Sequence, residues 1–250
     1  MNRHFFNNEY SYNVFVIKKY RSKFKLILFK ALRNSGVDLP CKKHGNNPYK
    51  LQNNLSRAKS TIYELAICND WDYFVTLTIN RNKYNRENLK EYYKDFSKFL
   101  NNYNYQNHCN IKYLFIPELH KDGKSWHMHG LLYNLPENKL TVNKNGYLDW
   151  LDYSIRFGYM SLSKIRDIER TSLYITKYIT KSTENTKIEL GNHLYYCSKG
   201  LKRADKLFKG YIYGINPNLK YDFINDYLSI KNLSEEDLKD IITESEFVKI

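Results

Sequence analysis

Residues 126–133 alternate between side chains of different polarity with a period of two and no helical periodicity. This pattern predicts a strand that places His127 and His129 on one face of a sheet and Met128 and Leu132 on the other. An apolar run over residues 111–116 predicts the preceding strand, and the turn-forming residues 121–124 join the two. The chain must therefore contain an antiparallel hairpin with two imidazoles on one face.

A carboxylate is expected beside these imidazoles. Glu118 ends the first strand of the hairpin, so the turn brings it alongside His127 and His129. Two imidazoles and one carboxylate form an incomplete ligand set, which suits Mg²⁺ or Mn²⁺ acting as a Lewis acid better than a closed structural zinc site. A His-x-His pair on a strand also occurs as two surface histidines without any metal, and the pair alone does not separate these possibilities.

The octet 174–181 combines two phenols with two ammonium groups. Wound as a helix at roughly 100° per residue, it places Tyr174, Lys177, Tyr178 and Lys181 within one arc of about 100°. A cation one turn from a tyrosine favours the phenolate and stabilises charge on a phosphate under attack. An amphipathic helix with half-buried tyrosines and solvated lysines would give the same pattern.

Three motifs in this order, the strand 74–79, the pair in 127–129 and the octet 174–181, resemble those of the HUH endonucleases. The pattern is most similar to the two-tyrosine rolling-circle replication initiators (Rep proteins) of small single-stranded DNA phages and related plasmids. The resemblance implies a metal-dependent DNA endonuclease and strand transferase. It also implies a 5′-phosphotyrosine on Tyr174 or Tyr178, and a 3′-hydroxyl that primes replication.

The resemblance also sets the expected fold, which is α+β with a ferredoxin-like or RRM-like antiparallel sheet, the HUH nuclease fold. A strand, a helix, two strands and a later helix follow in the order that this family uses. We expect a largely helical N-terminal extension over residues 1–70, the nuclease domain over 71–204, and a C-terminal extension over 205–250 that ends in a helix. A capping box at residues 234–237 predicts the start of that helix.

Several polar residues are predicted to contact DNA. The strand 71–80 offers hydroxyls and an amide on one face, although threonine is also simply a good strand former. A segment after the octet, 195–203, mixes aromatic and basic residues. The predicted DNA contacts are Thr78, Asn80, Arg81, Lys199, Lys202 and Arg203.

Composition supports a polyanionic partner. The net charge of +14 fits single-stranded DNA, but equally RNA, a ribosome or an anionic membrane. The 24 tyrosines and 13 phenylalanines would suit base stacking, but an AT-rich genome explains most of the tyrosine count. Four unpaired cysteines, and no apolar stretch of membrane-spanning length, predict a protein of the bacterial cytoplasm with no membrane partner. No phosphate-binding Gly-x-x-x-x-Gly-Lys loop is present, so unwinding and synthesis are assigned to a host helicase and polymerase.

Two other functions were weighed. An HUH transposase or relaxase would share the chemistry, but relaxases usually carry their tyrosine ahead of the histidines, and small transposases generally use one tyrosine. A non-catalytic nucleic-acid-binding module would bind without metal and form no covalent product. The joint presence of the Glu118 group and the tyrosine octet argues against the module.

Overall fold

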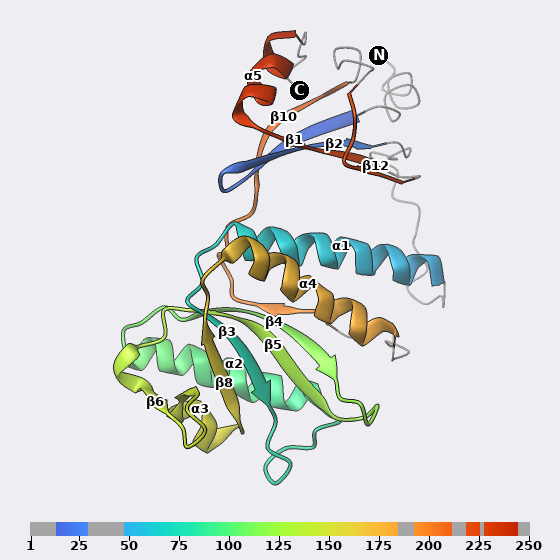
Figure 1. The fold of residues 1–250 in the computed structure, drawn as a ribbon. Coiled ribbons are helices and arrows are strands. Elements are labelled where there is room, and N and C mark those ends of the chain that lie inside the picture. The colour runs from blue at the N-terminus through green and yellow to red at the C-terminus, as the bar shows by residue number, and fades with distance from the viewer. Residues whose placement is uncertain (1–13, 30–47, 185–192, 212–218, 226–227, 245–250) are drawn as a thin grey trace, which may run out of the picture. The chain divides into compact units, whose positions relative to one another are not determined.

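The computed structural model describes residues 14–29, 48–184, 193–211, 219–225 and 228–244 (Figure 1). The chain divides into a central unit, Asn46–Lys202, and a terminal unit made of Met1–Gly45 and Arg203–Ile250. These described parts contain two antiparallel sheets and five α-helices, which confirms the α+β class. No helix among the described residues is both long and apolar enough to cross a membrane.

The central unit is built on an antiparallel sheet with the strand order β6-β7-β8-β3-β5-β4-β9. Its middle is formed by four strands that run the length of the sheet. These are β3 (Tyr73–Thr78), β4 (Lys112–Leu119), β5 (Trp126–Tyr133) and β8 (Met160–Lys164). Three short strands complete the edges: β6 (Leu140–Val142), β7 (Leu148–Trp150) and β9 (Tyr196–Cys197).

One face of this sheet packs on helix α2 (Leu89–Gln106), whose start is capped by the Asn88 side chain accepting a hydrogen bond from the Glu91 amide. The buried stripe of α2, Tyr92, Phe96, Leu100 and Tyr103, is spaced at three and four residues and therefore faces one side. The short helix α3 (Leu151–Arg156) adds Tyr153 to the same core.

The opposite face is covered by helices α1 (Pro48–Ile67) and α4 (Ile168–Glu184), which lie side by side in Figure 1. Their apolar residues form a second core with Leu114 and Ile116 of β4 and Leu131 of β5. The sheet is therefore sandwiched between helices, and α4 lies on the face that carries the two histidines.

Strand register fixes what stands on that face. Glu118 pairs directly with His127, and His127 pairs with Thr78 on the other side. Two residues along, His129 pairs with Thr76. Because directly opposed residues in antiparallel strands share a face, all of these side chains point toward α4.

The terminal unit has a five-stranded antiparallel sheet in the order β10-β1-β2-β12-β11. Its strands are β1 (Val14–Tyr20), β2 (Lys23–Phe29), β10 (Asp205–Tyr211), β11 (Phe223–Ile224) and β12 (Leu228–Leu233). Helix α5 (Glu235–Glu244) follows, and Ser234 and Asp237 form the predicted capping box. The prediction of largely helical extensions is therefore wrong for the described strands at both ends of the chain.

The division into units also differs from the predicted boundaries. Helix α1 belongs to the central unit rather than to an N-terminal extension, and residues 14–29 pair with residues 205–211 and 228–233. The expectation failed because β1 and β2 find their sheet partners about 200 residues away, which no local pattern records.

Candidate active site

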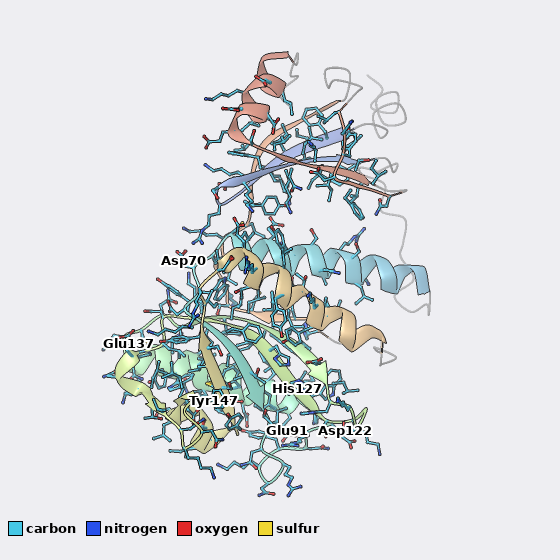
Figure 2. The ribbon with its side chains drawn as sticks, viewed as in Figure 1. Asp70, Glu91, Asp122, His127, Glu137 and Tyr147 are labelled. Carbon is cyan, nitrogen blue, oxygen red and sulfur yellow. The ribbon has the colours of Figure 1, made fainter. Side chains whose placement is uncertain are left out.

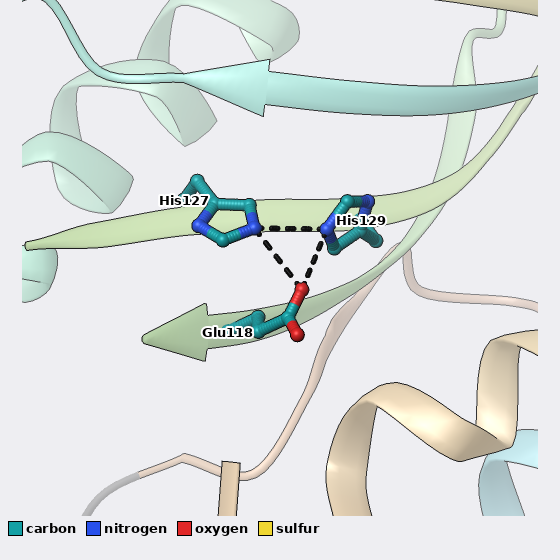
Figure 3. A group of neighbouring side chains, drawn as sticks. All are labelled: Glu118, His127 and His129. Carbon is teal, nitrogen blue, oxygen red and sulfur yellow. Dashed lines mark hydrogen bonds and ion pairs between the residues drawn. The ribbon is translucent and has the colours of Figure 1, made fainter. Parts of the chain in front are cut away.

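Three ligand-type atoms converge at the end of the β4–β5 hairpin (Figure 3). The Oε2 atom of Glu118 lies 3.0 Å from Nε2 of His127 and 2.7 Å from Nε2 of His129, and the two nitrogens are 2.9 Å apart. These side chains are 12–15 % exposed, so the group is mostly shielded but open on one side. The structure thus brings together the three residues that the sequence singled out.

The donor set fits a divalent ion. Neighbouring ligands at right angles around an octahedral ion with bonds of about 2.1 Å lie about 3.0 Å apart, close to the separations seen between these three atoms. Two imidazoles and one carboxylate occupy only part of such a coordination sphere, which leaves positions for water and a substrate oxygen. This group can hold a metal, and its chemistry favours Mg²⁺ or Mn²⁺ as predicted.

Neighbouring strands and the hairpin turn hold these ligands in place. The Thr76 hydroxyl lies 3.1 Å from Nδ1 of His129, so a hydrogen donated by Nδ1 leaves the Nε2 lone pair facing the Glu118 group. In the turn, hydrogen bonds from Ser125 and the Lys124 amide lower the pKa of Asp122 to about 2. Figure 2 places Asp122 at the hairpin tip and His127 on the strand that follows.

Helix α4 places both tyrosines over this group. The Tyr178 ring stacks on His129 with 3.9 Å between ring centroids and an interplanar angle of 22°. The Tyr178 hydroxyl donates a hydrogen bond of 2.6 Å to the Tyr174 oxygen. The expectation that the helix and the hairpin meet over one site is confirmed.

The two tyrosines differ in environment. Tyr178 is 6 % exposed and belongs to the core between the sheet and α4, whereas Tyr174 is 46 % exposed. Burial raises the pKa of Tyr178, and its hydrogen bond to Tyr174 and the charge of Glu118 raise it further. Tyr178 is thus both a core residue and a phenol at the site, which the sequence pattern presented as alternatives.

Phe74 connects the parts of the site and was not singled out from the sequence. Its ring centroid lies 5.6 Å from that of Tyr174, and 6.1 Å from those of Tyr178 and His129. His120 was missed as well; its ring centroid lies 4.2 Å from that of His127. The period-two pattern of β3 places Phe74 and Thr76 on the histidine face, so register was the one available signal for them.

The predicted lysines are resolved unequally. The Lys177 ammonium nitrogen lies 5.8 Å from the centroid of the Tyr174 ring, a cation–π separation. Lys181 is in α4, but its side chain lies outside the described residues.

The predicted DNA-contact residues fall in different places. Thr78 stands opposite His127, and Asn80 and Arg81 follow the end of β3, where the Asn80 side chain accepts a hydrogen bond from the Asn82 amide. By contrast, the Ser198 amide bonds the Tyr113 carbonyl, roughly 17 Å along β4 from Glu118 at the usual strand rise.

The remaining members of that set are therefore not gathered at the metal-ligand group. Lys199 follows Ser198, and the backbone of Lys202 is held by the Asn69 side chain at the end of α1. Arg203 falls in the terminal unit.

Comparison with known proteins gives one match. Residues 72–183 match the model of a family described as replication-associated protein ORF2/gene II protein. The matched segment contains strands β3 to β8 and helix α4 up to residue 183, and so includes the ligand group and both tyrosines. The searches of curated proteins and of solved structures found no match.

Proposed function

Because residues 72–183 belong to the replication-associated protein ORF2/gene II protein family, we propose that this chain initiates rolling-circle replication by nicking and rejoining single-stranded DNA. The observation that carries the proposal is the stacking of Tyr178 on His129, which brings a tyrosine pair to a metal-ligand group. Neither a purely structural helix nor a surface histidine pair accounts for this arrangement.

Strand order supports the HUH nuclease fold within this proposal. Numbered along the chain, β3, β4, β5 and β8 stand in the sheet order 4-1-3-2, which is the order of a ferredoxin-like sheet. The hairpin strands β4 and β5 thereby carry the ligands, while the chain after β8 leads directly into the tyrosine helix.

Glu118, His127 and His129 would hold the Mg²⁺ or Mn²⁺ ion. When bound, the ion supplies Lewis-acid activation of the scissile phosphate and offsets its negative charge. The chain positions the ion through strand register and through the Thr76–His129 hydrogen bond.

Tyr174 is assigned as the first nucleophile, because its hydroxyl is accessible and accepts the Tyr178 hydrogen bond. Its oxygen forms a bond to phosphorus as the bond from phosphorus to the 3′-oxygen breaks. The phenol proton passes to solvent, and the 3′-oxygen takes a proton from solvent. The product is a 5′-phosphotyrosine and a free 3′-hydroxyl.

The phosphotyrosine retains the energy of a phosphodiester, so a 3′-hydroxyl can reverse the step and close a circle without ATP. Tyr178 is assigned to the second cleavage, and Lys177 and Lys181 to stabilisation of phenolate and phosphate charge. The partners are single-stranded DNA and a host helicase and polymerase in the bacterial cytoplasm. Thr78, Asn80, Arg81, Lys199, Lys202 and Arg203 remain the proposed DNA contacts.

A labelled-oligonucleotide assay tests this proposal. The protein is incubated with Mn²⁺ and a pool of random single-stranded oligonucleotides labelled at the 3′ end, and the products are run on a denaturing gel. A 5′-phosphotyrosine carries the 3′ label onto the protein, whereas a 5′ label leaves with the released strand.

The tyrosine variants give the decisive comparison. The double change Tyr174→Phe and Tyr178→Phe is expected to abolish the labelled adduct. Tyr147→Phe serves as the control, since Tyr147 is 53 % exposed and lies in the same unit, in the turn between β6 and β7. An adduct that survives the double change would refute the assignment, and a wild-type protein that binds DNA without forming any adduct would favour the binding module.

A further inference from the structure

A pocket of about 550 Å³ opens beside Tyr174, where β8 ends and α4 begins. This volume is in the range of small-molecule and cofactor sites. Phe74 and Tyr174 belong to its wall, so it is continuous with the tyrosine site described above. Nothing in the sequence patterns had pointed to residues 164–170.

The wall of this pocket combines cations with apolar surface. Four cations line it, Lys164, Arg166, Arg170 and Lys177, against the single carboxylate of Asp167. The apolar part comes from the aromatic rings of Phe74 and Tyr174 together with Ile165 and Leu173.

That carboxylate is already engaged. Asp167 Oδ1 accepts a hydrogen bond from the Arg170 amide at the start of α4, and Oδ2 lies 3.2 Å from the Arg170 Nε atom. The pocket therefore keeps a net positive wall. The first turn of α4 adds the partial positive charge of a helix N-terminus.

Positive charge next to exposed aromatic rings is the combination that binds single-stranded nucleic acid, because the cations neutralise phosphates while the rings stack on bases. Leu173 is 59 % exposed and Tyr174 46 %, so both can be reached by a base from solvent. A metabolite site would instead enclose its ligand with few charges, which this wall does not do.

We propose that this pocket binds one nucleotide of single-stranded DNA that flanks the scissile phosphate, with Arg166 and Arg170 contacting its phosphates and Phe74 and Leu173 its base. The inference rests on the proposed nicking function and adds a subsite to it. Arg166 and Arg170 act as positioning residues, since they hold the strand and do not touch the reacting atoms.

Salt dependence of DNA binding tests the subsite without metal or cleavage. Binding of fluorescent dT₁₅ to the full chain is measured by anisotropy between 50 and 300 mM salt in EDTA. For single strands, the slope of log K against log salt changes by about 0.7 for each phosphate contact, so Arg166→Gln with Arg170→Gln is expected to reduce it by about 1.4. Lys90→Gln with Lys94→Gln removes the same charge from helix α2, on the other face of the sheet, and is expected to leave the slope unchanged.

The adduct assay separates failure of this inference from failure of the function. With the proposed function intact, the Arg166 and Arg170 double variant still forms the labelled adduct at saturating DNA, and requires a several-fold higher DNA concentration for half-maximal rate. If both charge-matched pairs lower the slope equally, or neither does, the subsite assignment is overturned, even when wild-type protein forms the adduct. If wild-type protein forms no adduct, the nicking function fails, and with it the assignment of the nucleotide to a scissile phosphate.

Discussion

Replacing Thr76 with valine isolates the support given to one metal ligand. The substitution removes the hydroxyl that lies 3.1 Å from Nδ1 of His129 and keeps the shape and strand preference of the side chain. A neutral hydrogen bond is worth about 1 kcal/mol, or roughly fivefold in affinity, and loss of a residue that orients a metal ligand typically weakens binding by about 10- to 100-fold. Because the bond is neutral and of ordinary length, we expect the lower end, about tenfold weaker Mn²⁺ binding.

Free Mn²⁺ measured by electron paramagnetic resonance during a titration of the DNA-free protein gives this affinity directly. Thr78→Val is the matched control, because Thr78 lies on the same strand and face and its hydroxyl makes no hydrogen bond to the described residues. Thr76→Ser restores a hydroxyl and is expected to recover most of the affinity. Equal Mn²⁺ affinities for Thr76→Val, Thr78→Val and wild type would refute the orienting role.

Three further predictions concern the nucleophiles and the fold. Tyr174→Phe is expected to abolish the 3′-labelled adduct of the first cleavage, whereas Tyr178→Phe keeps it and loses circle formation from a substrate with two nick sites; the reverse pattern on denaturing gels would exchange their roles. Gly130→Ala is expected to lower the free energy of unfolding by about 3 kcal/mol, since an added Cβ would lie 2.2 Å from a Phe115 ring carbon, and an unchanged urea midpoint would contradict this. Burial raises the pKa values of Tyr92 and Tyr153, so the folded state retains their protons above pH 10 and stability is lost as pH rises beyond that value; changing both to phenylalanine should flatten this loss in urea titrations at pH 9–11, and an equally steep loss would refute the attribution.

Sequence reasoning located the long elements of the central unit and missed the short ones. The predicted helices at 49–69 and 86–103 correspond to Pro48–Ile67 and Leu89–Gln106, because their apolar spacing persists over several turns. Residues 136–146 were expected to be a loop but contain the strand Leu140–Val142, which is too short to show a period. Its conformation is set by pairing with β7, a tertiary effect.

The candidate site divides in the same way. Glu118, His127 and His129 could be brought together on paper because a hairpin fixes register between neighbours in sequence. The contact between Thr76 and His129 joins residues 53 positions apart through two adjacent strands, so it becomes visible only once the sheet order is known. The cations at the start of α4 formed no motif, and only the structure gathers them into a pocket with Phe74.

The hydrogen bond between the two phenols constrains how they would share the proposed work. With 2.6 Å between their oxygens, both hydroxyls lie within reach of a single phosphate position, although Tyr178 is buried and Tyr174 is exposed. Once Tyr174 is esterified, its oxygen carries a phosphoryl group and is a poorer acceptor, which releases the Tyr178 hydroxyl toward the next phosphate. An exchange of roles therefore requires only a change of hydrogen-bond partner, and helix α4 can stay packed on the sheet through Ile175 and Ile179.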